Sequence, residues 1–400
     1  MKLRVLPASM SLKGKRVIVR VDWNIPIAGK GTEEDSLKME RSFDTIRDFA
    51  KRGAVVLLLT HLGRPKKRDV AHSTKKLAHI ASVLSGLKIH FVGEAVDDKK
   101  DLAKLAKAVQ SAKNGSIFLL ENVRFLKGEE QNDLKLAKAY ASLGDVFVND
   151  AFASCHRAHV SVVGIAKQLP AYAGASLANE VAGLERLLKK PKKPFLAVIG
   201  GSKLSTKIDV LTKLLSIADR VLVGGAMAHA FYAAKKMQIG KSYVEKSGIV
   251  AARKLLKHPK LVLPVDAVVA KTIDAKAHPY VVPVHKVKKQ EMIGDIGTET
   301  MMAWSDEIKR AGTIVWNGPL GVTEYGAFSH GSLVIARAIA ARSKGKCYGV
   351  VGGGDTLPIV LQSGMSEWID HLSTGGGAML EFMTMAGKLP GLEALAASKK

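Results

Sequence analysis

A glycine-rich stretch at residues 348–356, YGVVGGGDT, has the residue types of a phosphate-binding loop. Apolar residues typical of a buried strand come first, and three glycines, an aspartate and a threonine follow. Because glycine has no Cβ, backbone N–H groups in such a loop can approach a polyanion closely. Asp355 supplies the carboxylate oxygens that a hard cation such as Mg²⁺ prefers. Taken alone, the stretch could equally be a tight strand-to-helix turn with no ligand.

In the second half of the chain, the other predicted strands also lead into glycine-rich segments. They are followed by Gly200, Gly201 and Lys203, by Gly224 and Gly225, by Asn317, Gly318 and Gly321 with Glu324, by Gly352, Gly353 and Gly354 with Asp355 and Thr356, and by Gly375, Gly376 and Gly377. If a helix begins near Ser205, Lys203 and Lys207 would lie around its first turn and reach the same phosphates. The pattern favours backbone contact with a nucleotide phosphate tail. No Walker-type GxxxxGK[ST] sequence is present, and no GxGxxG follows a strand with an acidic residue about twenty positions on.

In the first half, the predicted strands end in basic and amide residues instead. Asp22 and Asn24 follow the strand at 16–21, and His61 and Arg64 follow the strand at 54–60. Glu121, Asn122 and Arg124 follow the strand at 116–120. After the strand at 145–148 come Asn149, Asp150, His156, Arg157 and His159. In an open parallel sheet, ligands bind outside the carboxyl ends of the strands. Any one of these residues alone would be a surface ion pair. Together, arginine and histidine suit a small anion carrying phosphate or carboxylate, which guanidinium grips bidentately.

A repeated pattern of strand, loop and helix must position these residues. Short apolar strands alternate with amphipathic helices, such as residues 101–113 with Leu102, Leu105 and Val109 on one face. This alternation predicts an α/β fold with parallel, doubly wound sheets. A chain of 400 residues is too long for one ordinary core, so two domains are expected. The boundary is predicted near the basic, proline-marked junction at 189–194, which ends a long helix at 173–190.

The composition narrows the function classes. Lysine and arginine total 61 against 36 aspartates and glutamates, a formal net charge of +25 that attracts anions of any kind. The lysines are not interleaved with aromatic residues, and no helix-turn-helix or finger pattern is found, so no specific nucleic-acid partner is predicted. Two distant cysteines suit a reducing cytoplasm. The sequence shows neither a signal peptide nor an apolar run of membrane-spanning length.

Two strand-end sites of different chemistry imply a reaction between two separately held ligands. Phosphoryl transfer fits best, because it depends on in-line positioning and charge stabilisation and needs little covalent help from the protein. Closure of the two domains would exclude water from a reactive phosphate. No serine–histidine–aspartate or cysteine–histidine arrangement that would require a nucleophile is evident.

The chain resembles the phosphoglycerate kinases over nearly its whole length. The motifs that carry the resemblance are RVDWNIP (20–26), HLGRP (61–65), LLENVRF (119–125), NDAFASCHRAH (149–159), GGSKLSTKI (200–208), WNGPLGVTE (316–324), GGGDT (352–356), STGGGA (373–378) and LPGLEAL (389–395). So many motifs in the same order make the resemblance highly specific.

This resemblance implies two Rossmann-like, parallel-sheet domains that face a cleft and are joined by a helical hinge. The implied divisions are a phosphoglycerate-binding domain at 1–172, a connecting helix at 173–190, a nucleotide-binding domain at 191–388, and a tail at 389–400 that packs on the first domain. The implied reaction is reversible, Mg²⁺-dependent phosphoryl transfer between 1,3-bisphosphoglycerate and ADP, giving 3-phosphoglycerate and ATP. The family also suggests a cytoplasmic monomer.

Residue roles follow from matching the motifs. Asp22, Asn24, His61, Arg64, Arg124 and Arg157 would hold the phosphoglycerate. Lys203 and Lys207 would contact the nucleotide phosphates and the moving phosphoryl group, while Gly375, Gly376 and Gly377 would stabilise transition-state charge. Gly201, Asn317, Glu324, Gly352, Gly353, Gly354, Asp355 and Thr356 would bind the nucleotide, with Glu324 on the ribose and Asp355 on Mg²⁺.

Three departures from the family pattern stand out. Counting back from HLGRP places Lys38 at the family's catalytic arginine, with Arg41 one helical turn further on, so either residue could supply the charge. Trp23 replaces a phenylalanine, which we expect to affect packing only. At residues 292–298 (MIGDIGT), an adenine-side glycine is replaced by Ile293 or shifted to Gly294.

Two alternatives stay open at this point. A non-enzymatic polyanion or nucleic-acid binder would use the net charge of +25. A related acyl-phosphate kinase would have an altered rate because of Lys38, since lysine keeps the charge of arginine but loses its bidentate fork.

Overall fold

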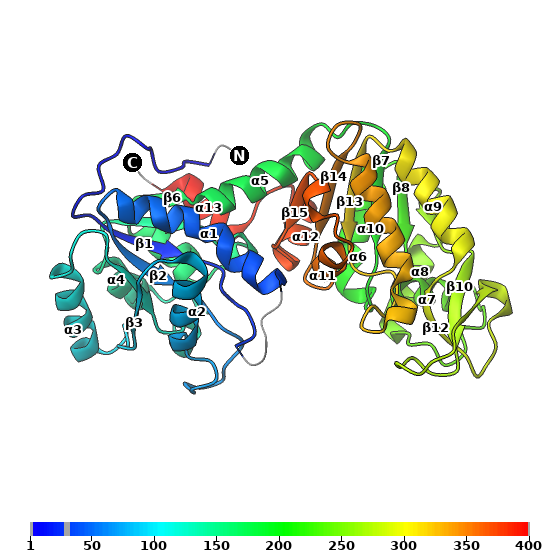
Figure 1. Cartoon of the computed structure of the whole chain (residues 1–400), viewed down its shortest axis with the longest axis horizontal. Helices are drawn as coiled ribbons and strands as arrows, with labels where there is room; N and C mark the ends of the chain where they lie inside the picture. Colours follow the sequence, from blue (N-terminus) through cyan, green and yellow to red (C-terminus); the bar gives the residue numbers. More distant parts are fainter. Residues whose placement is uncertain (1–2, 28–32, 399–400) are drawn as a thin grey trace. The chain divides into compact units, whose positions relative to one another are not determined.

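The computed structural model describes residues 3–27 and 33–398 (Figure 1). The chain divides into two compact units, unit 1 (Met1–Ala182 with Gly387–Lys400) and unit 2 (Gly183–Ala386). The division falls inside helix α5 (Ala175–Lys189), whereas the sequence placed its boundaries near the ends of this helix, at 172 and 190. The carboxyl-terminal segment of unit 1 begins at Gly387, two residues before the predicted tail.

Unit 1 contains a six-stranded sheet in which every neighbouring pair of strands is parallel. The order is β3-β4-β2-β1-β5-β6, with β1 (Arg16–Arg20), β2 (Val55–Leu59), β3 (Ile89–Val92), β4 (Ile117–Leu120), β5 (Val146–Asn149) and β6 (Ala171–Ala173). The four strands expected from the sequence are confirmed to within two residues at each end. The sequence did not predict β3 and β6, because β3 is partly exposed and β6 has three residues, so neither forms a clear apolar run.

The helices of unit 1 cover this sheet and close its core. They are α1 (Glu33–Lys51), α2 (Lys75–Ser85), α3 (Lys99–Gln110), α4 (Leu134–Ala141), the first part of α5, and α13 (Pro390–Ala397), with short helices η1 (Val123–Phe125), η2 (Phe152–Ser154), η3 (Val160–Gly164) and η4 (Ile165–Lys167). Trp23 is fully buried, its ring lies edge-on to Phe43, and its Nε1–H donates to Ser42 Oγ at 2.9 Å. The tryptophan that departs from the family pattern is therefore a packing residue of this core.

The carboxyl-terminal segment belongs to unit 1. Figure 1 shows helix α13, drawn in red, beside strand β6, although the two lie far apart in the sequence. The Gly391 N–H donates to the Cys155 carbonyl at 2.9 Å, and a Cβ at Gly391 would lie 3.0 Å from the Cys155 Sγ. Leu392 and Leu395 are buried, so this helix contributes side chains to the unit 1 core.

Unit 2 contains two sheets. The larger is again fully parallel, in the order β15-β14-β13-β7-β8-β9, with β7 (Phe195–Ile199), β8 (Arg220–Val223), β9 (Leu261–Val262), β13 (Thr313–Asn317), β14 (Tyr348–Gly352) and β15 (His371–Ser373). The smaller, antiparallel sheet has β10 (Asp266–Ala270) between β11 (Tyr280–Pro283) and β12 (Met292–Ile296). The alternation of strands and helices did not predict this second sheet, because no α-helix separates its strands.

The helices of unit 2 bury their apolar faces on these sheets. They are the rest of α5, α6 (Ile208–Ile217), α7 (Ala226–Ala234), α8 (Lys246–Leu255), α9 (Thr298–Arg310), α10 (His330–Arg342), α11 (Leu357–Gln362) and α12 (Gly377–Thr384), with η5 (Ser205–Lys207), η6 (Val284–Lys286), η7 (Gly326–Phe328) and η8 (Ser366–Trp368). Two parallel α/β units confirm the predicted fold class. Within the described part of the chain, no helix is long and apolar enough to cross a membrane.

We expect Leu392→Ala to destabilise the protein by about 2–5 kcal/mol, because it removes a fully buried side chain and leaves a cavity in the unit 1 core. Urea unfolding followed by circular dichroism measures the change. Leu134→Ala is the matched control, since Leu134 is 56% exposed and its truncation should change stability by about 0.5 kcal/mol or less. Equal effects of the two substitutions would show that α13 does not contribute to this core.

Candidate active site

The carboxyl ends of the unit 1 strands converge on the buried guanidinium of Arg20, the last residue of β1. Its Nε–H donates to Ser161 Oγ at 3.0 Å, and its Nη2 lies 3.2 Å from Ser154 Oγ and 2.9 Å from His61 Nδ1. Ser161 in turn donates to the buried carboxylate of Glu129. Burial lowers the pKa of Arg20, and the negative charge of Glu129 opposes that shift. Arg20 therefore ties three loops together beneath the strand ends.

Arg20 also fixes the proton of His61. Guanidinium only donates hydrogen bonds, so His61 Nδ1 must accept this one and the ring proton must sit on Nε2. Burial, followed by the charges of Arg20, Arg124 and Arg157, lowers the pKa of His61 well below its ordinary value. The ring is thus neutral near pH 7, with Nε2–H as its hydrogen-bond donor.

The remaining anion-binding candidates lie within electrostatic reach of one another. Burial lowers the pKa of Arg124, and the charges of Arg157, Arg20 and Arg64 add to that effect. Burial likewise lowers the pKa of His159 to about 4, again with Arg124 contributing. The mutual repulsion of these cations would be relieved by a bound anion. The structure therefore brings together His61, Arg64, Arg124 and Arg157, the residues at the ends of three different strands.

Asp22 and Asn24 complete this group. Asn24 Oδ1 accepts a hydrogen bond from the Gly63 N–H at 2.8 Å, and Arg124 Nη1 donates to the Gly63 carbonyl. Burial raises the pKa of Asp22, while the charges of Arg20 and Lys38 act in the opposite direction. The Lys38 amine of helix α1 therefore acts on the same group of strand-end residues.

Arg41 is engaged elsewhere. Its Nη1 lies 2.7 Å from Glu180 Oε1, and the Glu180 side chain is almost fully buried on helix α5. Removing either partner of such a pair leaves an uncompensated charge, so this contact holds α1 to α5. The two candidates for the family's catalytic arginine thus have different surroundings.

Other polar residues at the strand ends hold neighbouring loops. Glu121 accepts hydrogen bonds from Ser73 Oγ and the Thr74 N–H, both at 2.8 Å. Asn122 exchanges hydrogen bonds with the Leu62 backbone, and Asp150 Oδ1 accepts from the Leu177 N–H in the first turn of α5. These residues fix the loops that carry the charged side chains.

In unit 2, glycines allow the ends of β7, β13 and β14 to meet through backbone contacts. Gly318 has φ +92°, and a Cβ there would lie 2.2 Å from the Gly200 carbonyl oxygen. Asn317 Nδ2 donates to the Gly352 carbonyl at 2.7 Å, and Thr356 Oγ1 accepts from the Gly318 N–H at 2.7 Å. Asn317 and Thr356 are buried, so they shape this loop from within.

Lys207 is the lysine held against this glycine loop. Its Nζ donates to the Gly200 carbonyl and to Asn317 Oδ1, both at 2.9 Å. Burial lowers the pKa of Lys207 to about 8, and the nearby charge of Asp355 opposes the shift. Lys203 is exposed in the loop before η5, and Lys207 is the last residue of η5, so a helical segment begins at Ser205 and the two lysines lie on either side of its start. That both lysines reach the same phosphates stays a prediction.

The remaining glycine and acidic candidates lie at the same edge of the sheet. Gly354 and Asp355 are exposed in the loop after β14, which leads into α11. Gly376, with φ +49°, caps the amino-terminal end of α12, and nothing would contact a Cβ at this residue. The Gly375 N–H donates to Ser373 Oγ at 3.2 Å.

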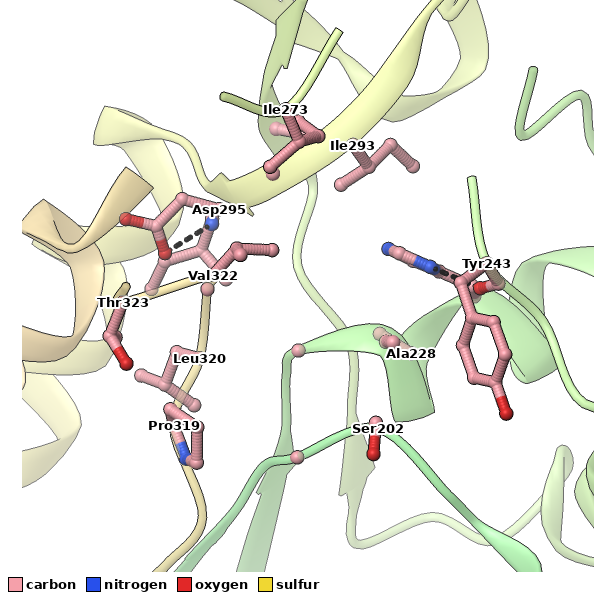
Figure 2. A pocket seen from close by; sticks show the side chains of 18 of the residues that line it. Ser202, Ala228, Tyr243, Ile273, Ile293, Asp295, Pro319, Leu320, Val322 and Thr323 are labelled. Atoms are coloured by element: carbon pink, nitrogen blue, oxygen red, sulfur yellow. Dashed lines mark hydrogen bonds between the residues drawn. The ribbon is translucent and has the colours of Figure 1, made fainter. Parts of the chain in front are cut away.

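A cavity of about 380 Å³ opens beside this loop (Figure 2). Gly201, Glu324 and Asp355 line it together with residues of α7, β10 and β12. Most of the cavity wall is apolar: Figure 2 labels Ala228, Ile273, Ile293, Pro319, Leu320 and Val322 around it. The cavity therefore extends from the glycine-rich phosphate region into an apolar space that suits a flat organic ring.

Much of this cavity was not predicted from the sequence. Ile293 and Gly294, the two candidate positions for the family's adenine-side glycine, both line it, and a Cβ at Gly294 would lie 2.1 Å from the Phe328 ring. The departure at residues 292–298 was the only sequence signal for this wall. It indicated a changed position but not the shape of the cavity.

Comparison with known proteins decides the family. The family model described as phosphoglycerate kinase matches residues 8–388. The phosphoglycerate kinase of Deinococcus radiodurans is 42% identical over 392 residues, covering 97% of this chain and 94% of the relative. That of Thermus thermophilus is 42% identical over 389 residues, covering 96% and 97%. The chain belongs to the phosphoglycerate kinase family.

Solved structures agree with this assignment. The phosphoglycerate kinase from Coxiella burnetii matches with a TM-score of 0.82 and 38% identity, covering 98% of this chain and 99% of that one. The enzyme from Pyrococcus horikoshii OT3 matches with a TM-score of 0.84 and 30% identity, covering 97% and 98%. The resemblance to phosphoglycerate kinases predicted from the motifs is confirmed. The chain is a kinase with a carboxyl group as acceptor, and the alternative of a non-enzymatic polyanion binder is set aside.

We expect His61 to stay neutral, with its proton on Nε2, from about pH 6 to 8, because Arg20 occupies Nδ1 and burial disfavours the charged ring. Long-range ¹H–¹⁵N NMR of the imidazole nitrogens measures both the tautomer and the titration, and His61→Gln assigns the signal. A midpoint near 6.5, or a proton on Nδ1, would contradict this account of the site.

Proposed function

We propose that this enzyme transfers a phosphoryl group between 1,3-bisphosphoglycerate and ADP, giving 3-phosphoglycerate and ATP, with the two ligands bound at the strand ends of different units. The observation that carries the proposal is the contrast between the two sites. Unit 1 presents guanidinium and imidazole donors, whereas unit 2 presents a glycine loop with a buried lysine and an exposed carboxylate. Family membership supplies the reaction that joins these chemistries.

The phosphoglycerate ligand is assigned to the unit 1 cluster. Arg64, Arg124 and Arg157 balance the phosphate and carboxylate charges, and His61 donates through Nε2–H. Asp22 accepts a hydrogen bond from the ligand hydroxyl, and Asn24 fixes the Gly63 backbone beside it. The pre-existing repulsion among the arginines favours an anion of high charge over a neutral ligand.

Lys38 is assigned the role of the family's catalytic arginine. Its charge acts on Asp22 within the cluster, whereas Arg41 forms an ion pair with buried Glu180. Moving Arg41 toward the substrate would break its ion pair with the buried Glu180 carboxylate, which is costly. An ammonium group stabilises the charge of the transferring phosphoryl group, without the two-pronged contact of an arginine.

The nucleotide is assigned to the glycine-rich edge of unit 2. Gly201, Gly352, Gly353 and Gly354 offer close backbone approach to the phosphates, Lys207 and Lys203 supply positive charge, and Glu324 is placed to bind the ribose. Buried Asn317 and Thr356 hold the loop in shape. Gly376 and Gly377, at the start of α12, provide N–H groups for charge developing in the transition state, whereas the Gly375 N–H donates to Ser373 Oγ.

The donor set at this edge fits Mg²⁺. Asp355 is an exposed carboxylate next to the phosphate loop, and its charge acts on Lys207. Among the described residues, no group of three or more histidines, cysteines, aspartates or glutamates could hold a metal. One carboxylate together with substrate phosphates is the usual protein environment of Mg²⁺. When bound, the ion neutralises phosphate charge, and Lys207 and the glycine N–H groups orient the same phosphates.

We further propose that the enzyme acts as a monomer in the cytoplasm. Both cysteines, Cys155 and Cys347, are buried as free thiols, and burial raises the pKa of each to about 12, which suits a reducing compartment. Size-exclusion chromatography with light scattering tests the oligomeric state.

Steady-state turnover with 3-phosphoglycerate and MgATP, coupled to a dehydrogenase, tests the activity. We expect a rate of roughly 1–100 s⁻¹ or above. Binding of both ligands without turnover would show that Lys38 does not sustain the chemistry. Absence of 3-phosphoglycerate binding would overturn the substrate assignment.

We expect Lys38→Ala to lower kcat by about 10²–10³-fold, because it removes a charge that stabilises the transition state. Lys38→Arg should retain at least wild-type turnover, since it restores the fork found in the family. The coupled assay measures all variants at saturating substrates.

Arg41→Ala is the matched control on the same helix. It should destabilise the fold, because it leaves Glu180 without this ion-pair partner, but should change kcat of the folded enzyme only a few-fold. If Arg41→Ala abolished turnover while Lys38→Ala did not, the assignment of Lys38 would be wrong.

A further inference from the structure

The apolar part of the unit 2 cavity contains a histidine that the phosphate and ribose assignments do not use. His229 lies on helix α7, lines the cavity and is only 4% exposed. Figure 2 shows Ala228 and Tyr243 on one side of the cavity and Leu320 and Val322 on the other. If the phosphates lie at the glycine loop, as the proposed function requires, the nucleotide base enters the space between these walls.

One nitrogen of this ring has a defined partner. His229 Nδ1 lies 2.8 Å from the Tyr243 carbonyl oxygen, and the dashed line beside Tyr243 in Figure 2 marks this bond. A carbonyl only accepts hydrogen bonds, so Nδ1 carries the ring proton. Burial lowers the pKa of His229, which keeps the ring neutral. Nε2 is consequently an unprotonated hydrogen-bond acceptor.

The other nitrogen is left for a ligand. Within the described part of the chain, the Tyr243 carbonyl is the one hydrogen-bond partner of this ring. The Nε2 atom is not fully buried, so some of its surface is accessible. The open space beside it is the cavity that His229 lines. A neutral acceptor in an apolar wall favours a ligand that brings an N–H group.

The buried aspartates that line the same cavity already have donors. Asp295 accepts hydrogen bonds from the Ile296 and Gly331 N–H groups, at 2.8 and 2.7 Å. Asp266 accepts from the Glu299 and Thr300 N–H groups, both at 2.9 Å. These carboxylates hold the ends of α9 and α10, which leaves His229 Nε2 as the better candidate for reading the base.

We propose that His229 determines base specificity by accepting, through Nε2, a hydrogen bond from the exocyclic amino group of adenine. A 6-oxopurine such as hypoxanthine carries a carbonyl at this position, which would place two acceptors opposite each other. Nε2 cannot become a donor in response, because the Tyr243 carbonyl holds the ring proton on Nδ1. A buried group that loses its hydrogen-bond partner discriminates strongly between substrates.

The test compares ATP with inosine triphosphate on the wild type, His229→Phe and the control His330→Phe. We expect the wild type to bind ATP at least about tenfold more tightly than inosine triphosphate. His229→Phe keeps a ring of similar size and should reduce this ratio to within about twofold, by weakening ATP. His330→Phe changes an exposed histidine at the start of α10 that does not line the cavity, and should keep the wild-type ratio.

A nucleotide that lacks the amino group completes the comparison. Purine riboside triphosphate, which carries only hydrogen at position 6, should bind wild type and His229→Phe with similar affinity. If His229 only supports the Tyr243 segment, the substitution would weaken all three nucleotides equally, which would overturn the proposal. If His229→Phe does not fold, His229→Leu provides the same comparison.

Two readouts separate this inference from the proposed function. Isothermal titration calorimetry measures the affinities without turnover, and the coupled assay with 3-phosphoglycerate measures KM and kcat. Absence of wild-type turnover with an intact preference for ATP would contradict the proposed roles of Lys38 or of the unit 1 cluster and leave the role of His229 standing. Normal turnover with equal affinities for ATP and inosine triphosphate would overturn the role of His229 alone.

Discussion

Parallel pairing within the two six-stranded sheets is the constraint on which both sites depend. Since every neighbouring pair is parallel, the carboxyl ends of all strands in a sheet meet at one edge. Residues separated by more than a hundred positions, such as Asp22 and Arg124, or Lys207 and Asn317, thereby come within reach of one another. The sheets provide the positions, and the loops after the strands provide the chemistry.

The two edges use backbone and side chain differently. In unit 1, Arg20 is buried among serine hydroxyls and His61, and it supports a group of cations whose charges disfavour one another. Such a group gains most from a small ligand with several negative charges. In unit 2, the strand ends lie so close that a Cβ at Gly318 would be 2.2 Å from the Gly200 carbonyl oxygen. The Lys207 amine donates a hydrogen bond to that same carbonyl. This edge suits a flexible phosphate tail, which many N–H groups contact at once.

The proposed roles of Lys38 and His229 rest on the contacts that their neighbours make. The α1 helix carries two cations one turn apart: Arg41 forms an ion pair with buried Glu180, whereas the charge of Lys38 acts on Asp22. The cavity wall likewise offers an imidazole whose acceptor nitrogen is defined by one backbone carbonyl, that of Tyr243. In the first case Glu180, distant in sequence, engages one of the two cations, and in the second a carbonyl 14 residues away sets the tautomer of the imidazole ring.

The sequence by itself determined the parallel strands, their order of appearance and the residues that follow them, because buried strands leave strong apolar runs bounded by glycine and charge. It did not predict β3 or β6, which are partly exposed or short, or the antiparallel sheet of β10, β11 and β12, whose strands no α-helix separates. Only the tertiary structure decided that Arg41 pairs with Glu180, that Asn317 and Thr356 are buried supports, and that His229 lines a cavity. These facts depend on contacts between distant segments, and no local pattern of residue types records such contacts.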